Sequence, residues 1–275
     1  MTALAANATA GTPRRRATTQ VRVPTVHRRM FDVFAWYGRW YLRRHFHAVR
    51  LSGGRPRVAV DQPLIVYCNH PSWWDPMVGI LLATQLFRGR HPYAPIDAAM
   101  LEQYRFFATL GFFGIQPDSV RGAVTFLRTG EAILQAPDRS LWVTAEGRFT
   151  DPRRRPVTLR AGVAHLAARL ERGVVLPLAL EYAFWTERLP EALCRFGEPI
   201  DIARHRGLSP RAWQVMLESQ LQQTMDALAA DAQTRDPRRF EPLLSGKAGV
   251  SLVYDAWRRL RGRHHGEHGA ADGRA

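Results

Sequence analysis

Apolar and polar residues alternate along the chain in blocks that predict strands followed by helices. Residues 63–68 (PLIVYC) form a nearly continuous apolar run, which is expected of a strand that is buried on both faces of a parallel sheet. Residues 75–87 have a helical pattern, and Pro76 suits the first turn of that helix. Asp75 is the predicted N-cap residue, because its carboxylate can accept a hydrogen bond from a free N–H group of the first turn.

The same alternation continues toward the C-terminus. The predicted strands are residues 112–116, 141–145, 174–181 and 193–196, and the predicted helices are residues 122–135, 159–170 and 210–230. Pro177 predicts a bulge or an edge position for its strand, because proline has no N–H group to donate to a neighbouring strand. Strands and helices in this order predict an α/β fold, with a mixed, largely parallel sheet flanked by helices.

The regions outside this core differ from it in composition. Residues 1–27 are rich in Ala, Thr and Arg and are predicted to be a flexible basic arm. The α/β core is predicted over residues 51–205 and C-terminal helices over residues 206–263. The last of these helices, at 250–263, is short, basic and amphipathic. Residues 264–275 are predicted to be a disordered tail.

Residues 28–50 combine aromatic and arginine residues in a pattern that predicts an amphipathic helix. The aromatic residues near helical spacing are Phe31, Phe34, Tyr37 and Tyr41, and arginines flank them. Rings and guanidinium groups on one helix are typical of a helix that lies on a membrane surface, at the depth of the lipid headgroups. A helix packed on the core of its own domain has the same pattern. The residues alone leave both interpretations open.

Composition and charge restrict the class of protein. Hydrophobic residues make up 46% of the chain, which excludes a wholly disordered protein. The net charge of +15 attracts phosphate groups on nucleic acids, on lipid headgroups or on a cofactor. The two cysteines, Cys68 and Cys194, imply no disulfide framework and favour a reducing compartment. No run approaches the ~20 apolar residues of a membrane-spanning helix, and the N-terminus lacks the apolar segment of a signal peptide. We therefore expect a soluble or surface-attached protein in the cytoplasm.

Residues 69–75 (NHPSWWD) are the most informative segment. A buried strand ends at His70, and ligands of open α/β sheets bind beyond the carboxyl ends of strands. The turn into the next helix can return the imidazole to Asp75, which would fix its tautomer and stabilise the imidazolium. A substrate hydroxyl can then act as the nucleophile, and the N–H groups that begin the helix are candidates to stabilise an oxyanion.

Other roles fit the same residues. Asp75 can simply cap the helix, and His70 can be a turn residue that bonds to the backbone. Cys68 lies on the same strand face as His70, so a Cys–His nucleophile pair is conceivable. Ser72 is a further conceivable nucleophile, or only a capping residue.

Residues 69–75 resemble the N-H-x-S-x-x-D block of the glycerolipid acyltransferases, the 1-acylglycerol-3-phosphate acyltransferase family. The core signature of this family is a His, four residues and an Asp. Residues 146–150 (EGRFT) follow a strand and resemble the second block of the family, Glu-Gly-Thr-Arg-Ser. Residues 174–178 (VVLPL) resemble a later apolar block around a proline. The resemblance covers roughly residues 40–200, with the three blocks in the family's order.

The resemblance implies acyl transfer from acyl-CoA or acyl carrier protein to a hydroxyl of a lysophospholipid, most commonly 1-acylglycerol-3-phosphate, or of a related lipid alcohol. His70 would be the general base and Asp75 would orient it. Neither a metal nor a cofactor is required. The residues expected to contact the substrates are Ser72, Trp73, Trp74, Arg121, Glu146, Gly147 and Arg148. The acyl groove has further candidates in Phe106, Phe107, Phe112 and Phe113.

Two positions depart from the family pattern. Arg148 directly follows Gly147, where the family has Thr-Arg. Asp118 stands where another block of the family ends in an arginine, and Arg121 lies three residues further on. In the family these arginines hold the phosphate of the acceptor. The likeness therefore supports acyl transfer more strongly than it supports 1-acylglycerol-3-phosphate as the acceptor, and a lipid alcohol without phosphate stays open.

Two other functions compete with this interpretation. The charge permits a nucleic-acid-binding protein, but no nucleic-acid-binding motif is present and we expect no such partner. A thioesterase-like hydrolase would also use His70, and it would release thiol without an acceptor. The tail histidines His264, His265 and His268 lack a surrounding structure, so no metal site is expected. The expected partners are the lipid acceptor, the acyl thioester (carried by CoA or by acyl carrier protein) and a membrane surface, with a peripheral location on the cytoplasmic face of the inner membrane.

Overall fold

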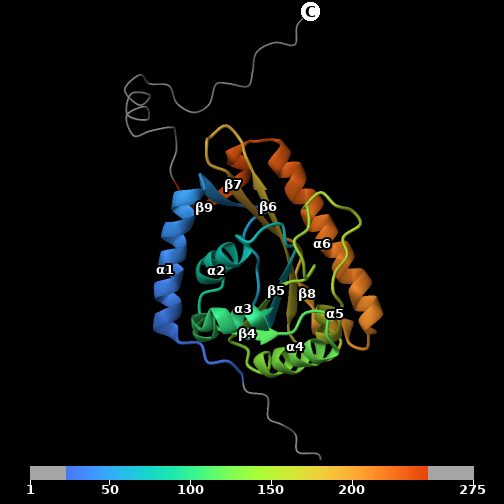
Figure 1. Ribbon diagram of the computed structural model, residues 1–275. Helices are drawn as coiled ribbons and strands as arrows, with labels where there is room; N and C mark the ends of the chain where they lie inside the picture. Colours follow the sequence, from blue (N-terminus) through green and yellow to red (C-terminus); the bar gives the residue numbers. More distant parts are fainter. Residues whose placement is uncertain (1–22, 247–275) are drawn as a thin grey trace, which may run out of the picture.

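The computed structural model describes residues 23–246, and Figure 1 shows their arrangement around a central sheet. The nine strands are β1 (Ala48–Ser52), β2 (Leu64–Cys68), β3 (His91–Asp97), β4 (Phe112–Ile115), β5 (Arg139–Thr144), β6 (Val174–Ala183), β7 (Glu191–Phe196), β8 (Ile200–Asp201) and β9 (Phe240–Ser245). They lie in the order β4-β3-β5-β2-β6-β7-β1-β9, and β8 pairs with β6. All neighbours from β4 to β6 are parallel, as are β7 and β1, while β7 is antiparallel to β6 and β9 to β1. The predicted mixed, largely parallel sheet is confirmed.

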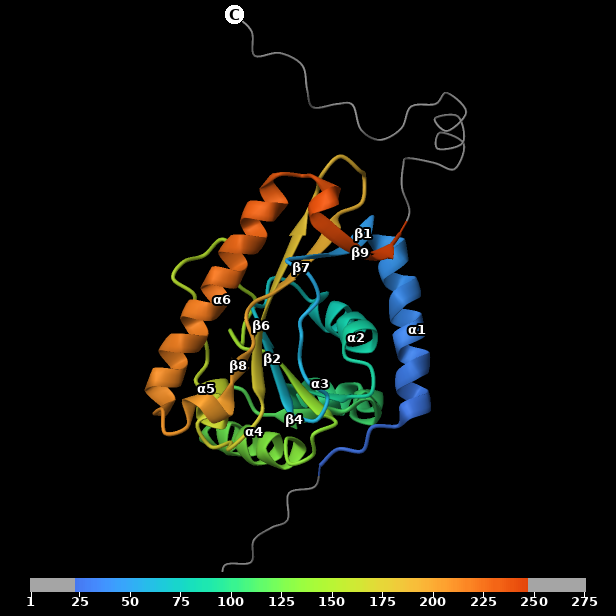
Figure 2. The same cartoon turned by 180° about the vertical axis from the view of Figure 1, so that it is seen from behind.

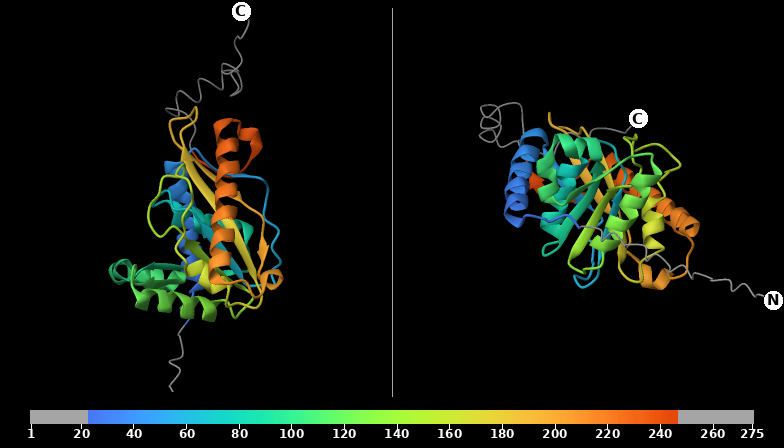
Figure 3. Two further views of the ribbon diagram at one scale, coloured as in Figure 1. Left: turned by 90° about the vertical axis from the view of Figure 1, so that its right-hand side faces the viewer. Right: turned by 60° about the horizontal axis from the view of Figure 1, so that its bottom comes forward.

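Helices cover both faces of the sheet. The α-helices are α1 (Arg28–His45), α2 (Asp75–Leu86), α3 (Ala98–Gln103), α4 (Val120–Ile133), α5 (Gly162–Ala167) and α6 (Pro210–Gln233), and the short 3-10 helices are η1 (Arg105–Leu110), η2 (Ile202–His205) and η3 (Pro237–Arg239). Figures 1 and 2 show α1 and α6 on opposite flanks of the molecule. Figure 3 shows α3 and α4 together at the end of the sheet that β4 forms. No helix among residues 23–246 combines the length and hydropathy that crossing a bilayer requires.

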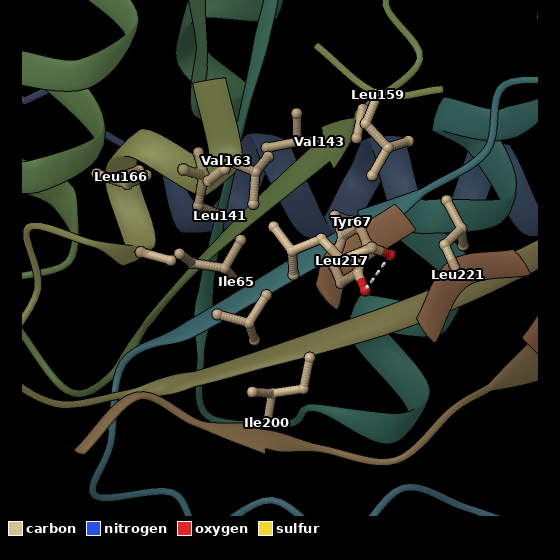
Figure 4. Close-up of a cluster of buried hydrophobic side chains, with 14 of the residues drawn as sticks. Ile65, Tyr67, Leu141, Val143, Leu159, Val163, Leu166, Ile200, Leu217 and Leu221 are labelled. Atoms are coloured by element: carbon tan, nitrogen blue, oxygen red, sulfur yellow. Dashed lines mark hydrogen bonds between the residues drawn. The ribbon is translucent and has the colours of Figure 1, made fainter. Parts of the chain in front are cut away.

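The predicted buried strand is β2, and its two faces enter different cores. Ile65 and Tyr67 pack in the cluster that includes Leu217 of α6, where the Tyr67 hydroxyl donates to the Leu217 carbonyl at 3.1 Å (Figure 4). Leu64 and Val66 face the other way, into a cluster with residues of α1 and α2. Both faces are thus removed from water, which explains the uninterrupted apolar run. Burial of each large aliphatic side chain contributes about 1.5–3 kcal/mol.

Several predicted boundaries change in the structure. The predicted helix over residues 28–50 ends at His45, because the next residues form β1 between β7 and β9. The region 206–263, predicted to be helical, contains β9 as well as α6, because Phe240–Ser245 completes the sheet beside β1. The predicted arm before residue 23, the helix at 250–263 and the tail at 264–275 lie outside the described residues.

The predicted N-cap position of Asp75 is wrong, and so is the edge position, one of the two alternatives predicted for Pro177. Asp75 is the first residue of α2, and Trp74 occupies the N-cap position without a side-chain hydrogen bond. Pro177 lies in β6, in the middle of the sheet and not at its edge. It is tolerated there because it falls between Val175, the last residue paired with β8, and Leu178, the first paired with β7. On that side of β6, no hydrogen bond between strands therefore requires the N–H group that proline lacks.

The helix α1 uses one face for packing and leaves the other exposed. Its buried residues are Phe31, Ala35, Gly38 and Leu42. Gly38 permits a close approach to α2, because a side-chain Cβ at this position would lie 3.2 Å from the methyl group of Met77. Trp36 and Trp40 are exposed on the outer face, by 70% and 50%. The packing interpretation of this segment is therefore correct, and the aromatic residues of the outer face still require an explanation.

Candidate active site

The turn between β2 and α2 is held by polar side chains from neighbouring elements. The buried amide of Asn69 pairs with β6: its nitrogen donates to the carbonyl of Leu180 at 2.9 Å, and its oxygen accepts from the N–H of Leu180 at 2.8 Å. The carboxylate of Glu146, from the loop after β5, accepts the backbone N–H of His70 at 2.7 Å. These contacts fix the backbone on both sides of His70, so the imidazole starts from a defined position.

His70 and Asp75 form the pair that the sequence predicts. The Nδ1 atom of His70 lies 2.6 Å from Oδ2 of Asp75, and the side chains are 16% and 1% exposed. The Asp75 carboxylate also accepts the N–H of Ser72 at 3.2 Å and the hydroxyl of Tyr182 at 2.7 Å. Within residues 23–246, the Nε2 atom of His70 has no hydrogen-bond partner. A carboxylate on Nδ1 therefore leaves Nε2 as the nitrogen that is available to a substrate.

A cavity of about 820 Å³ adjoins this pair, within the size range of small-molecule sites. Apolar side chains from several helices and strands line most of it, including Phe31, Ile80, Tyr93, Leu110, Phe112 and Phe126. Polar lining residues include His70, Gln116, Asp118, Arg148 and Arg160. The cavity thus joins an apolar chamber to a histidine with a free ring nitrogen.

Glu146 lies behind the turn instead of in the cavity wall. Its side chain is buried, and burial raises the pKa of its carboxyl, while the hydrogen bond from the His70 N–H acts in the opposite direction. It is absent from the residues that line the cavity. This position favours a role in holding the His70 backbone over contact with an acceptor headgroup.

Gly147 and Arg148 follow at the edge of the cavity. Gly147 has a φ of +66°, and a Cβ there would lie 2.0 Å from Nε of Arg160, so only glycine fits. The Arg160 guanidinium rests against this glycine and pairs with Asp118 at 2.8 Å. Arg148 is exposed and lines the cavity. Sequence reasoning missed Arg160, because only the fold brings it against Gly147.

Most of the remaining predicted contact residues lie outside the cavity lining. Ser72 donates its N–H to Asp75, and its hydroxyl accepts the N–H of Trp74 at 3.3 Å. The rings of Trp73 and Trp74 stack at 4.3 Å, and Trp74 packs on Phe46. Of the four predicted groove phenylalanines, only Phe112 lines the cavity. The exposed Arg121, in the first turn of α4, does not line it either.

Phe149 is a cavity residue that the sequence did not indicate. Its ring centroid lies 4.4 Å from that of His70, and the residue is 62% exposed. The N–H of Thr150 donates to the His70 carbonyl at 3.0 Å and ties this loop to the turn. Phe149 therefore forms part of the surface that an incoming substrate meets beside the imidazole.

Two mechanistic alternatives lose support from the geometry. Burial raises the pKa of the Cys68 thiol well above its usual value, and a thiol held neutral is a poor nucleophile. The predicted oxyanion donors at the start of α2 are also unsuitable. Asp75 and Met77 already donate to the carbonyls of Ser72 and Trp74, and Pro76 has no N–H group. Within the described part of the chain, no His, Cys, Asp and Glu side chains gather as a metal site, and the tail histidines lie outside it.

Residues 47–181 match the family model named Acyltransferase. This part of the chain belongs to the acyltransferase family. The matched range of this acyltransferase begins just before β1 and ends within β6, so it includes the turn with His70 and Asp75 and the loop with Glu146. Tyr182 lies one residue beyond it.

Comparison with solved structures found the 1-acyl-sn-glycerophosphate (LPA) acyltransferase PlsC from Thermotoga maritima, with 15% sequence identity and a TM-score of 0.44. The match covers 74% of this acyltransferase and 79% of that chain. Comparison with curated proteins gave no match.

Proposed function

We propose that this acyltransferase moves a fatty acyl group from a thioester, acyl-CoA or acyl carrier protein, to a hydroxyl of a membrane lipid alcohol. The observation that carries the proposal is the 2.6 Å contact between His70 Nδ1 and Asp75, beside an apolar cavity and within the domain of the family. An apolar chamber suits the acyl chain, and the free Nε2 atom suits a hydroxyl. Among lysophospholipids, 1-acylglycerol-3-phosphate is the first acceptor to test.

In the proposed reaction His70 is the general base. Its Nε2 atom takes the proton of the acceptor hydroxyl while Asp75 stabilises the imidazolium that forms. The acceptor oxygen attacks the thioester carbonyl, the new C–O bond forms, and the C–S bond breaks. The departing thiolate takes up the proton from His70, which restores the neutral imidazole. No acyl-enzyme is required, because the acceptor itself is the nucleophile.

The oxyanion of the tetrahedral intermediate needs hydrogen-bond donors near the reacting carbon. The N–H groups of Arg148 and Phe149 have no hydrogen-bond partner in the described structure and belong to cavity residues. They replace the N–H groups at the start of α2 as the candidates for this role. Their loop is tied to His70 through Thr150, which supports the assignment.

Thiol release by the purified protein tests the reaction. Acyl-CoA and acyl carrier protein are each supplied with and without a panel of lysolipids that includes 1-acylglycerol-3-phosphate. Acyl transfer predicts thiol release that requires an acceptor and an acylated lipid product. Thiol release at the same rate without any acceptor would instead identify a hydrolase. Retention of oligonucleotides without thioester consumption would favour a nucleic-acid-binding protein.

Arg148 is proposed to bind the headgroup of the acceptor. It is exposed and lines the cavity, and a guanidinium can form two parallel hydrogen bonds to a phosphate. We expect Arg148→Ala to raise KM for a phosphate-bearing acceptor about tenfold, with little change in KM for the acyl donor. The control is Arg154→Ala, an exposed arginine of the same loop that does not line the cavity. Unchanged KM values for both substrates in Arg148→Ala would remove this role.

We further propose that the outer face of α1 binds the membrane surface peripherally, on its cytoplasmic side. Rings in contact run from Phe106 of η1 through Phe34 to Tyr37, and on through Tyr41 to Trp74 in the turn beside the active site. Exposed Trp and Tyr are typical of the headgroup region, and the arginines of α1 suit anionic lipids. This surface would place the active-site turn close to lipid acceptors.

Vesicle binding tests the membrane proposal. We expect the protein to float with anionic but not with neutral liposomes, and Trp36→Ser to weaken binding about tenfold because it removes a large exposed ring. Val33 of α1 and Val215 of α6 provide a matched pair, since they are 62% and 63% exposed on opposite flanks (Figure 2). Val33→Ser should weaken binding a few-fold, and Val215→Ser should not. Equal effects of the two valine substitutions would contradict docking through α1.

A further inference from the structure

Tyr182 contacts the one oxygen of Asp75 that His70 leaves free. Its hydroxyl donates to Oδ1 of Asp75 at 2.7 Å, while Oδ2 faces Nδ1 of His70. Asp75 is almost completely buried, so a missing hydrogen bond is not replaced by bulk water. Both oxygens of the carboxylate are therefore held, one by the imidazole and the Ser72 N–H and the other by Tyr182.

The fold holds Tyr182 in this place from two directions. It lies near the end of β6, two residues after Leu180, whose backbone is bound on both sides by the Asn69 side chain. The Tyr182 ring also packs on Phe46, with centroids 5.7 Å apart. The turn that carries His70 and the strand that carries Tyr182 are thus fixed to each other, and the hydroxyl meets the carboxylate without any rearrangement.

We infer that Tyr182 is a positioning residue for the proposed acyl transfer: its hydroxyl aligns the Asp75 carboxylate on His70 and moderates the negative charge that the imidazole meets. The inference rests on the proposed function for its catalytic meaning, but the link between Tyr182, Asp75 and His70 can be measured without turnover. A hydrogen bond to a carboxylate withdraws part of its charge. Loss of this bond makes Asp75 attract a proton on His70 more strongly.

The surrounding groups keep the Tyr182 hydroxyl protonated, so that it can donate a hydrogen bond to Asp75. Burial, together with the nearby Asp75 charge, raises the pKa of the Tyr182 hydroxyl well above its ordinary value. Cys68 of β2 and Cys194 of β7 also act on this site, and burial raises the pKa of both thiols, so they stay neutral. Glu146 is the other carboxyl that acts on Asp75 and His70, and its pKa is also raised by burial. Glu146 is therefore the carboxyl for which the titration experiment needs a control.

The test compares two tyrosines that each donate one hydrogen bond. Tyr182→Phe keeps the ring and removes the bond to Asp75, whereas Tyr67→Phe removes a bond to the Leu217 carbonyl, on the other side of β2. The protonation midpoint of His70 is followed by NMR of protein labelled in its histidines, with His70→Ala used to assign the signal. We expect the midpoint to rise by roughly half a pH unit or more in Tyr182→Phe and to stay unchanged in Tyr67→Phe.

Activity gives the second readout. With acyl-CoA and an active acceptor from the lysolipid panel, the acid limb of the kcat/KM profile should move to higher pH in Tyr182→Phe, by the same amount as the NMR midpoint. In the Asp75→Ala background, Tyr182→Phe should have no further effect on the His70 midpoint, because Tyr182 acts through Asp75. Tyr182→Phe should also raise the midpoint in the Glu146→Gln background, where the competing carboxyl is absent.

The outcomes separate this inference from the proposed function. A Tyr182→Phe protein with lower stability and an unchanged His70 midpoint would show a purely structural role and overturn the inference. An effect of equal size in the Asp75→Ala background would also overturn it. A raised midpoint, combined with full turnover in His70→Ala, would sustain the link among the three residues and refute the general-base mechanism instead.

Discussion

Replacing His70 with alanine is expected to lower kcat for acyl transfer by about 10²–10⁴-fold while the protein remains folded. The side chain lines the cavity and is partly exposed, so its removal leaves the core intact. The loss arises because the acceptor hydroxyl then has no base to take its proton. The measurement is acceptor-dependent thiol release at saturating donor and acceptor, together with circular dichroism and thermal unfolding to establish that the variant is folded.

A second histidine provides the control for this experiment. His91 begins β3, is partly exposed and lies 3.8 Å from Asp138, outside the cavity lining. His91→Ala should retain the turnover of the original protein. If folded His70→Ala enzyme keeps near-normal turnover, the assignment of His70 as the general base is wrong.

Asp75→Asn should reduce kcat nearly as far, again by about 10²–10⁴-fold, although the side chain keeps its size. The carboxylate accepts from His70, Ser72 and Tyr182, so it has acceptor oxygens on both sides. An amide must turn its NH₂ group toward one of these donors. It then either loses the contact with His70 or leaves Tyr182 without an acceptor, and it cannot balance the charge of an imidazolium.

The matched carboxylate for this test is Asp201, which accepts the N–H of Ala203 at 2.8 Å and caps η2 away from the cavity. Asp201→Asn is expected to leave kcat unchanged. Steady-state kinetics of both variants over a range of pH is the measurement. An Asp75→Asn enzyme that loses stability but not kcat would show that Asp75 is only structural.

The sequence allowed the elements around β2 to be predicted because their burial leaves a local pattern. An apolar run without alternation indicates a strand that is covered by helices on both faces. Proline near the start of α2 is typical of the first turn of a helix. The strands β1, β3, β8 and β9 were not predicted. β3 contains Pro92 and Pro95, which weaken a strand pattern, and β1 and β9 become recognisable only when they pair with each other.

The active site also contains residues that local spacing predicts and residues that only the fold brings together. His70 and Asp75 are five residues apart, so one turn brings them together and spacing alone suggests the pair. Tyr182 is separated from Asp75 by 107 residues, and its position depends on the register between β2 and β6. Arg160 is similar, since its place against Gly147 follows from the fold of a long loop. Trp73 and Trp74 lie next to the active-site residues in sequence but stack on each other outside the cavity, and Trp74 also packs on Tyr41 of α1.

The two sides of α1 would connect the membrane surface to the active-site cavity. Phe31 on the inner side forms part of the cavity wall, while Trp36 and Trp40 project from the outer side of the same rigid rod. If α1 docks on a membrane as proposed, a tilt that the headgroup layer imposes on this helix would also move Phe31 in the cavity wall. The lateral pressure of the bilayer would then be a variable of the reaction rate, acting through a wall of the chamber without the need for a separate lid.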